Sequence, residues 1–249
     1  MSTPEAVTYE RDGHVAVITM NKPDRMNRLD PELVAGLKQS WKRLMADDEA
    51  RVAVVTGAGE KAFSAGADLK NVPHNLYHAI PSVGVPVDKP VVGAVHGWCI
   101  GGGMVITTMC DILIAADNTK FSYPEVKIAF SGGLISNLAS RIPHKIAMEL
   151  LLVGDNMDVQ RAYEVGYVNK VVSRDELMPT AMDWARRIAE TAPMPSRMLK
   201  RFVHETLPKG PTEHAAIARV QVEDINNSED WVEGQASFAE KRKPVYKGR

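Results

Sequence analysis

The stretch VVGAVHGWCIGGGMVITTMCD, residues 91 to 111, decides the fold. Its β-branched start, Val91 to Val95, predicts a buried strand, and the apolar pattern Met104 to Met109 predicts a helix. The glycines Gly101 to Gly103 join the two. A helix that begins at a glycine turn directs backbone N–H groups and the positive end of its dipole at one point. Because glycines lack a Cβ, a ligand atom can reach that point. The stretch therefore suits an anion, either permanent or forming in a transition state.

The three glycines also have a purely structural explanation, because they let a helix pack closely on a sheet. No Lys-Ser or Lys-Thr pair follows them, so the turn is not a phosphate-binding P-loop, and its spacing is not GxGxxG. Taken alone, this turn leaves a binding site and close packing as equal alternatives.

A second turn upstream favours the binding site. The segment KAFSAGADL, Lys61 to Leu69, follows VAVVTG, which predicts another buried strand from Val52. Its part Ala65-Gly66-Ala67 is built from small residues and leads to Asp68, an acid suited to capping a new helix. The two turns can each supply one backbone N–H group, from Ala67 and from Gly102, to a single oxygen.

Several motifs now resemble one family. They are AFSAGADL, the glycine turn preceded by KPVVGAVHG, CDILIAADNTKFSYPE, AYEVGYVNKVV and FAEKRKP. Together, in this order and over nearly the whole chain, they resemble the crotonase, or enoyl-CoA hydratase/isomerase, superfamily. The resemblance implies an α/β fold, with a ββα-superhelix (spiral) core and a C-terminal helical region that builds trimers. It also implies an enzyme that stabilises the enolate of a coenzyme A thioester.

Composition excludes several other classes. The 249 residues carry a net charge of −1, which gives no sign of nucleic-acid binding or of a basic membrane-binding patch. Cys99 and Cys110 form no CxxC or Cys/His cluster, so we expect buried free thiols, no metal site and a reducing, cytoplasmic location. The N-terminus has no apolar signal segment, and no run of eighteen apolar residues predicts a membrane span.

Outside the two turns the pattern is that of a covered sheet. Alternation from Val7 to Asn21 across Asp12-Gly13 predicts a hairpin, and Pro31 to Asp47 predicts a helix capped by Asp30. Further strands are expected at 52–56, 91–95, 112–115 and 168–172. Because several of these strands lack alternation, we expect helices on both faces of the sheet.

The segment between Asp68 and Lys89 has little helical pattern and contains Pro73, Pro81, Gly84 and Pro86. Members of the superfamily usually place a longer helical stretch here, beside the acyl group. This departure leaves the acyl specificity open. Contact with the substrate is one alternative for His74, Tyr77 and His78, but we expect them to be surface groups of this loop and assign them no role.

Everything after Arg174 is predicted to be helical, with helices at 176–192, 195–207, 211–227 and 229–241. We therefore divide the chain into a core that binds acyl-CoA, residues 1–173, and a helical oligomerisation region, residues 174–249. The resemblance implies a homotrimer, or a homohexamer formed as a dimer of trimers. It also implies that Phe238 and Lys241 cover the coenzyme A of a neighbouring subunit. A solvated basic tail is the alternative reading.

Glu125, in FSYPEVKIAFSGG, is the candidate proton shuttle. Its neighbours Tyr123, Pro124, Val126 and Ile128 predict partial desolvation, which raises the pKa of a carboxyl group toward neutrality. An exposed turn acid is the alternative from spacing alone. The resemblance makes the glutamate of this Pro-Glu step catalytic.

By the same resemblance the backbones of Ala67 and Gly102 form the oxyanion hole. The residues expected to bind the substrate or its coenzyme A are Arg25, Ala65, Asp68, Leu69, Tyr123, Phe238 and Lys241, with Arg25 as a candidate phosphate contact. No tightly bound cofactor is expected, since coenzyme A arrives as part of the substrate.

One position departs from the hydratases of the superfamily, which carry a glutamate where this chain has Val105. Those enzymes hold water between two carboxylates, whereas Glu125 alone suits double-bond isomerisation, or a hydration or lyase reaction that the substrate assists. A dehalogenase or carbon–carbon hydrolase is disfavoured because Gly132 and Gly133 are not aspartates. A catalytically degenerate acyl-CoA-binding oligomer is the alternative from another class.

Overall fold

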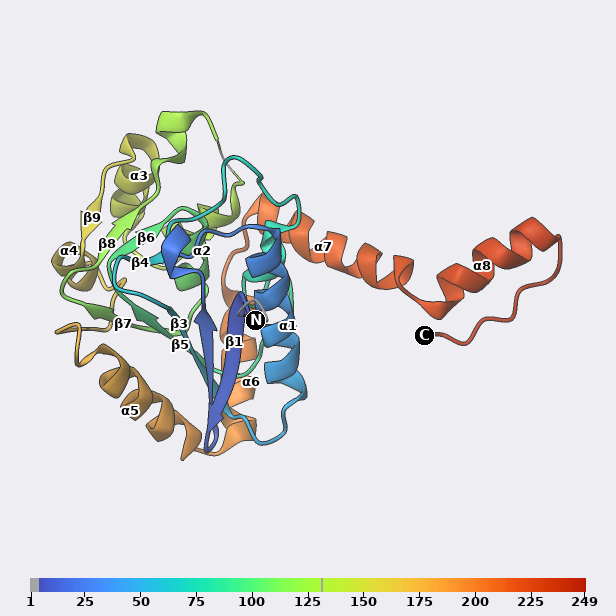
Figure 1. The fold of residues 1–249 in the computed structure, drawn as a ribbon, viewed down its shortest axis with the longest axis horizontal. Coiled ribbons are helices and arrows are strands. Elements are labelled where there is room, and N and C mark those ends of the chain that lie inside the picture. The colour runs from blue at the N-terminus through green and yellow to red at the C-terminus, as the bar shows by residue number, and fades with distance from the viewer. Residues whose placement is uncertain (1–4, 131) are drawn as a thin grey trace.

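A computed structural model describes residues 5–130 and 132–249, and its centre is a pair of sheets (Figure 1). The larger sheet has the order β1-β2-β3-β5-β7-β10, with β1 and β2 antiparallel and every other pair parallel. Its strands are β1 (Val7–Asp12), β2 (Val15–Met20), β3 (Val52–Gly57), β5 (Val91–Val95), β7 (Ile112–Ala116) and β10 (Lys170–Val172). The smaller sheet has the order β4-β6-β8-β9, with β4 (Ala62–Ser64), β6 (Trp98–Ile100), β8 (Lys120–Ser122) and β9 (Met157–Asp158).

The chain passes from the larger sheet to the smaller one three times, from β3 to β4, from β5 to β6 and from β7 to β8. Each passage takes only a few residues. The strands that begin these passages pair in parallel in the larger sheet, and the strands that end them pair in parallel in the smaller sheet. This repetition is the expected spiral. Both turns singled out in the sequence follow a strand of the smaller sheet, which brings them to the same edge.

Both faces of the larger sheet are covered, as the uninterrupted apolar strands predicted. In β3, Val52 and Val54 face α5 (Leu177–Ala189), while Ala53 and Val55 face the core beneath α1 (Pro31–Ala46). α1 begins where expected, because the Asp30 side chain accepts a hydrogen bond from the Leu33 N–H at 2.9 Å. The buried side chains that α1 contributes are Leu33, Val34, Leu37, Ser40, Trp41 and Leu44.

Short helices complete the upper half of the molecule. They are η1 (Pro23–Arg25), η2 (Leu76–Ala79), α2 (Gly102–Thr108), η3 (Pro124–Ile128), η4 (Leu134–Ser140), α3 (His144–Val153) and α4 (Val159–Glu164), where η denotes a 3₁₀ helix. Gly154 ends α3 at φ +70°, in the left-handed conformation that glycine adopts readily. Across the described ranges, 5–130 and 132–249, no helix has both the length and the apolar character needed to cross a membrane.

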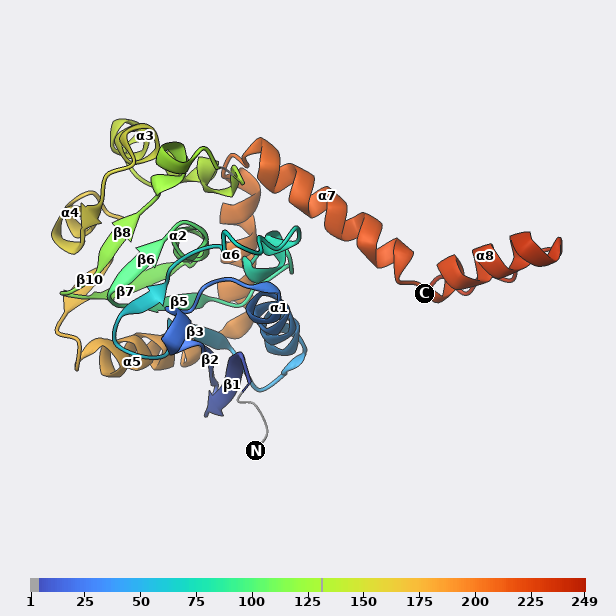
Figure 2. The ribbon, with the colours of Figure 1, turned by 45° about the horizontal axis from the view of Figure 1, so that its top comes forward.

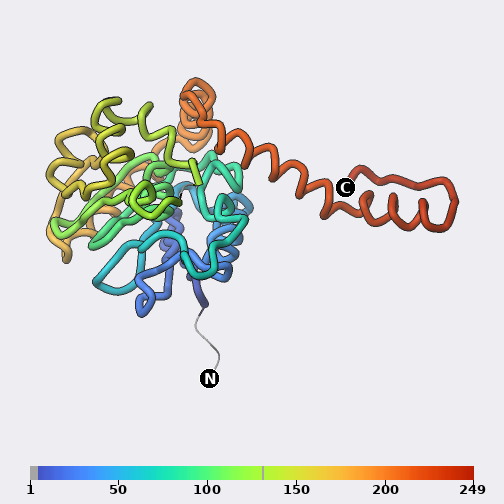
Figure 3. Tube along the Cα trace, turned by 90° about the horizontal axis from the view of Figure 1, so that it is seen from above, coloured from blue at the N-terminus to red at the C-terminus, as the bar shows by residue number. Residues whose placement is uncertain are grey.

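The C-terminal helices are α6 (Pro193–Thr206), α7 (Pro211–Asn226) and α8 (Glu229–Glu240), close to the predicted bounds. α6 is fixed to the sheet by Lys200, whose Nζ donates to Lys89 O at 2.8 Å and to Asp111 Oδ2 at 2.7 Å. We call residues 5–130 and 132–206 the body and residues 227–249 the arm. α7 starts on the body and leads away from it, so the arm stands apart (Figures 2 and 3). The last residues fold back along α8, where the Asp230 N–H meets Arg249 O at 3.2 Å.

Candidate active site

A cavity of about 370 Å³ opens where the two glycine-containing turns meet. Four parts of the chain form its wall: the loop after β4, the start of α2, the segment from Tyr123 to Leu134, and the first half of α7. Ala67, Gly102, Val105, Tyr123 and Glu125 all line it. The structure thus brings together the three residues predicted to be catalytic, which lie on separate loops of the spiral.

The N–H groups of Ala67 and Gly102 are both available to a ligand. Ala67 pairs with Leu29 in a parallel bridge that uses Gly66 O and the Asp68 N–H. In such a bridge the central residue directs its own N–H away from the pair. Gly102 is the first residue of α2, where N–H groups have no partner within the helix. Among the residues that the structure describes, neither group donates to a protein acceptor.

Close backbone approach explains the glycines of these turns. A Cβ on Gly66 would lie 2.7 Å from Ile100 O and 3.2 Å from Gly102 N, so only glycine lets the two turns touch. A Cβ on Gly101 would lie 2.6 Å from Glu125 Oε1, and its φ of +53° already favours glycine. The Gly101 N–H donates to Ser122 O at 2.9 Å, which continues the pairing of β6 with β8.

The surroundings of Glu125 raise the pKa of its carboxyl group toward neutral pH. Its residue is only 7% exposed, and among the described residues its Oε2 has no hydrogen-bond partner. Burial raises the pKa of Glu125 to about 7, with an opposing, smaller effect of its own backbone. A carboxyl group in this state can both donate and accept a proton at neutral pH.

Comparison with known proteins agrees with this geometry. A family model described as enoyl-CoA hydratase/isomerase matches residues 10–249. The chain belongs to the enoyl-CoA hydratase/isomerase family.

Relatives and solved structures cover almost its entire length. The chain is 36% identical to the (E)-benzylidenesuccinyl-CoA hydratase of Thauera aromatica, over 97% of this chain and 99% of the relative. It is 34% identical to the carnitinyl-CoA dehydratase of Escherichia coli K12, over 98% of this chain and 99% of the relative. The crystal structure of a carnitinyl-CoA hydratase from Mycobacterium avium matches with a TM-score of 0.77 and 32% identity, over 99% of this chain and 100% of that structure. These findings confirm the superfamily, its fold and an enzyme acting on CoA thioesters.

Of the residues predicted to bind the substrate or its coenzyme A, Tyr123 lines the cavity, whereas Arg25, Ala65, Asp68 and Leu69 do not. Ala65, Asp68 and Leu69 belong to the loop that carries Ala67 but do not line the cavity. The Ala65 N–H donates to Met26 O at 2.8 Å, and Asp68 lies 3.4 Å from the Arg28 guanidinium. Arg25 is exposed at the end of η1, on the loop that these contacts tie to the Ala67 turn.

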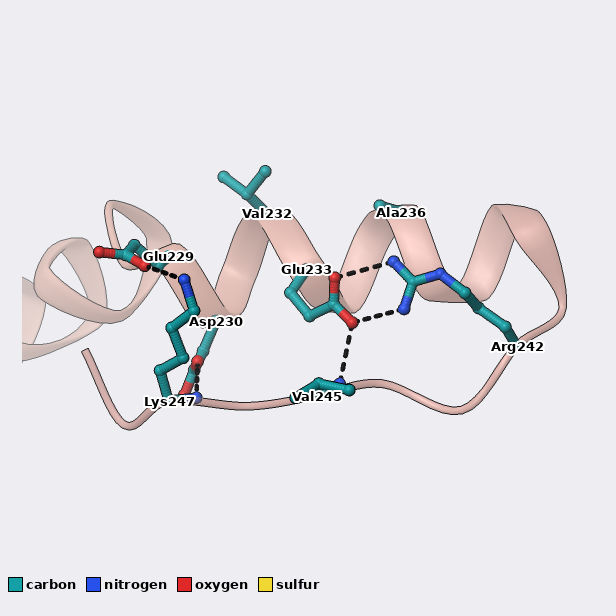
Figure 4. Close-up of a pocket in the computed structure, with 8 residues that line it drawn as sticks. All are labelled: Glu229, Asp230, Val232, Glu233, Ala236, Arg242, Val245 and Lys247. Atoms are coloured by element: carbon teal, nitrogen blue, oxygen red, sulfur yellow. Dashed lines mark hydrogen bonds and ion pairs between the residues drawn. The ribbon is translucent and has the colours of Figure 1, made fainter.

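Phe238 and Lys241 lie in the arm, away from the cavity of their own chain (Figure 2). A larger hollow of about 550 Å³ also lies there, between α8 and the returning tail. Figure 4 shows Glu233 bridging Arg242 and the Val245 N–H inside it. Its charged groups already satisfy one another, so the smaller cavity, with its unpaired donors and Glu125, is the candidate site.

Two predictions about the segment after Asp68 were wrong. No helix starts there, because Asp68 Oδ1 accepts from the Lys70 N–H at 3.2 Å and closes a turn. Tyr77 and His78 are not surface groups of the loop but are buried. Glu223 of α7 accepts a hydrogen bond from the Tyr77 hydroxyl and lies 2.8 Å from His78 Nε2. His74 is exposed, as expected, at the rim of the cavity.

Sequence reasoning missed two residues that shape the Ala67 turn. Asn27 is fully buried, and its side-chain nitrogen donates to Ala58 O and Ala62 O, both at 3.0 Å. Ser64 Oγ donates to Asn27 O at 2.8 Å and accepts from the Gly66 N–H at 3.2 Å. In the sequence, each of these two residues appears only as a single polar residue close to an apolar segment.

The two cysteines are buried and free, as predicted. Within residues 5–130 and 132–249, no group of three or more His, Cys, Asp or Glu side chains is placed to hold a metal ion.

Proposed function

We propose that the thioester carbonyl oxygen binds between the N–H groups of Ala67 and Gly102, and that Glu125 transfers the proton at the adjacent carbon. The observation that carries this proposal is the convergence, in one cavity, of one buried carboxyl group with a raised pKa and two backbone donors that are unpaired among the described residues. Membership of the family supports it.

The two donors act on the charge that forms during the reaction. When the α-carbon loses a proton, negative charge collects on the thioester oxygen, and fixed N–H groups stabilise it without rearranging. Removing one such donor elsewhere costs about 3 kcal/mol of transition-state stabilisation. Because both donors here are backbone groups, side-chain substitutions would alter their position and not their number.

A single carboxyl group is enough for reversible dehydration of a 3-hydroxyacyl-CoA. Glu125 takes the α-proton as the enolate forms, and returns it to the departing β-hydroxyl, which leaves as water. The balance is one thioester in, one enoyl thioester and one water out, with Glu125 restored. Val105 adds no second carboxylate to this scheme. The similarity to a hydratase and a dehydratase of CoA thioesters supports this reaction.

Double-bond isomerisation is the second candidate, and the same observation favours it. One carboxyl group removes a proton from one carbon and returns it to another, with the same oxyanion stabilised throughout. It differs from dehydration only in whether a β-hydroxyl is present to leave.

The finer assignments belong to the same proposal. Coenzyme A is part of the substrate, with no other tightly bound cofactor, and Arg25 contacts its phosphates. Residues 1–173 supply the oxyanion donors and Glu125, the first half of α7 forms one side of the cavity, and residues 174–249 assemble the chain into a trimer or a dimer of trimers in the cytoplasm. Support for assembly comes from the exposed apolar side chains of α6 to α8, among them Met194, Phe202, Ile225 and Phe238. Phe238 and Lys241 then reach the coenzyme A of a neighbouring subunit.

Proton NMR in deuterated water tests the chemistry with 3-hydroxybutyryl-, crotonyl-, 3-hexenoyl- and feruloyl-CoA. Loss or gain of a β-hydroxyl, or an aldehyde released from feruloyl-CoA, identifies a hydratase or lyase. A moved double bond with deuterium at the α- or γ-carbon identifies an isomerase. We expect Glu125→Gln to lower kcat by about 10²- to 10⁴-fold, because it removes the proton shuttle.

Glu149→Gln is the matched control, since Glu149 is an exposed acid on α3 outside the cavity. It should leave kcat within about twofold, and Glu125→Gln should bind thioesters nearly as tightly as the unaltered enzyme. Retained turnover combined with lost binding in Glu125→Gln would refute the proposed role. Tight binding without turnover of any substrate by the unaltered protein would favour the degenerate binder.

A further inference from the structure

Arg219 gives the cavity a cation that the proposed chemistry does not use. It lies on α7 and lines the cavity together with Thr212, Ala215 and Ala216 of the same helix. Among the described residues of the wall it is the one Lys or Arg. The side chains between the glycine turns and α7 are mainly apolar, and include Leu76, Phe130 and Leu134. An acyl chain that starts at the oxyanion donors and runs toward α7 therefore passes apolar side chains to reach the part of the wall that Arg219 lines.

The carboxylate nearest Arg219 is already used by other groups. Glu223 lies one turn further along α7, with Oε1 3.7 Å from Arg219 Nε. The same Oε1 accepts from the Tyr77 hydroxyl, and Oε2 lies 2.8 Å from His78 Nε2. Lys38 Nζ is a further cation, 3.9 Å from Oε2. Glu223 therefore serves as the hydrogen-bond partner of η2, and it does not pair closely with Arg219.

The charges of this cluster do not balance. Burial, and then the nearby Lys38, lower the pKa of His78, which keeps its imidazole neutral at pH 7. Lys38 and Arg219 are then two cations against the one carboxylate of Glu223, so a single positive charge is left over. Arg219 stands at the cavity, while Lys38 faces the neighbouring hollow between α1 and α7. An anion in the cavity would meet this excess charge at Arg219.

We propose that Arg219 binds a carboxylate carried by the acyl group, so that the enzyme acts on thioesters of dicarboxylic acids. This rests on the proposed function only for the direction of the acyl chain, from Ala67 and Gly102 toward α7. A guanidinium offers two parallel N–H donors to a carboxylate, a pairing that neutral acyl groups cannot make. Tyr77 borders the same part of the wall and is held by Glu223, which fixes the cavity beside Arg219.

The test compares carboxylates with uncharged amides of the same shape. Succinyl-, glutaryl- and adipyl-CoA are each paired with the corresponding terminal amide, and binding to the full-length enzyme is measured by calorimetry. Coenzyme A is the same within each pair, so its own contacts cancel in the ratio. We expect at least one carboxylate to bind roughly tenfold to a hundredfold more tightly than its amide. Higher ionic strength should reduce this ratio.

Variants of Arg219 then assign the preference. Arg219→Leu should bring the ratio to about one, and Arg219→Lys should retain only part of it, because a lysine lacks the planar pair of donors. Arg187→Leu is the control: Arg187 is 68% exposed and 4.0 Å from Asp183, against 72% and 3.7 Å for Arg219 and Glu223. It should leave the ratio unchanged.

Three results would overturn the inference. They are a ratio near one for all three pairs in the unaltered enzyme, an unchanged ratio in Arg219→Leu with both affinities kept, and an unchanged ratio in Arg219→Leu with both affinities lowered equally. The last would place Arg219 on the phosphates of coenzyme A instead. Calorimetry measures binding without turnover. If the protein converted no thioester, the proposed function would be contradicted, and the binding ratio would still test the role of Arg219.

Discussion

The body and the arm treat the same kinds of side chain in opposite ways. Phe121, in β8, is completely buried and packs edge-on against Tyr167 at 5.1 Å between ring centroids, whereas Phe238, in α8, is 88% exposed. Glu125 in the body is buried without a basic partner, whereas Glu233 in the arm is paired with Arg242 at 2.6 and 2.8 Å. The oxyanion donors and Glu125 thus come together within the body of one chain. The arm has apolar surface that only another molecule can bury.

Paired aromatic truncations test this comparison with the largest expected effect. Phe121→Ala should lower the free energy of unfolding by about 3 to 5 kcal/mol, because it leaves a cavity between the two sheets. Phe238→Ala should change it by less than about 0.5 kcal/mol, since the ring contacts little of its own chain. Urea denaturation at protein concentrations low enough to separate chains measures both.

Sedimentation of the same two proteins at higher concentration completes the test. Phe238→Ala should lower the fraction of assembled protein. Phe121→Ala should leave the assembly of folded chains unchanged. A large loss of stability in isolated Phe238→Ala chains would show that the arm packs on its own body, and the contrast between the two regions would disappear.

The two glutamates give the next largest effect, with opposite dependence on pH. The folded pKa of Glu125 is about 7 against an ordinary 4.5, so between these values the folded state holds a proton that the unfolded chain has released. Stability from this group is therefore lost as pH rises from about 4.5 to 7. Glu125→Gln should be more stable than the unaltered protein by up to about 3 kcal/mol at pH 8, and by little at pH 4.5.

Glu233 should show the reverse sign. Hydrogen bonds from Arg242 lower its pKa to about 2, so the stability it contributes is complete above pH 4.5 and is lost as pH falls toward 2. Glu233→Gln should thus be less stable than the unaltered protein at pH 7, by a small amount because the pair lies at the surface. Thermal unfolding of both variants across pH 3 to 8 compares the two signs. Parallel pH profiles for the two variants would contradict the assigned environments.

The sequence was sufficient for features that depend on neighbouring residues. Uninterrupted apolar strands, the glycine turns, the Asp30 cap and the C-terminal helices follow from local pattern, and all are present. The raised pKa of Glu125 and its cause, burial, were also predicted, but only part of the expected shielding is present. Tyr123 is buried, whereas Val126 and Ile128 are each about half exposed, and the carboxyl group lies close to the glycine turn at Gly101.

Contacts between distant segments could not be predicted in this way. Tyr77 and His78 looked like loop-surface residues because nothing near them in sequence buries them. Their partner, Glu223, lies about 145 residues further along the chain. Arg219 was overlooked for the same reason, since an arginine on an amphipathic helix ordinarily faces solvent. Its place at the cavity depends on where α7 crosses the body.

Glycine substitutions give the smallest and most local test. Gly101→Ala combines a left-handed backbone, φ +53°, with a Cβ 2.6 Å from Glu125 Oε1. Strain should lower stability by about 1 to 3 kcal/mol, and displacement of the carboxyl group should lower kcat by about a hundredfold. Gly13→Ala, φ +58°, and Gly248→Ala in the arm, φ +72°, have the same backbone conformation with nothing within 4 Å of the new Cβ.

The three glycine variants separate strain from displacement. Gly13→Ala in the hairpin should lose stability and keep its kcat, because it repeats the strain of Gly101→Ala without touching the carboxyl group. Gly248→Ala should lose neither, since the end of the arm can relax where the body cannot. Equal loss of kcat in Gly13→Ala would mean that strain alone disables the site. Full activity in Gly101→Ala would mean that the Glu125 carboxyl group can move without loss of function. The close contact between Gly101 and Glu125 in the body would then not be needed for catalysis.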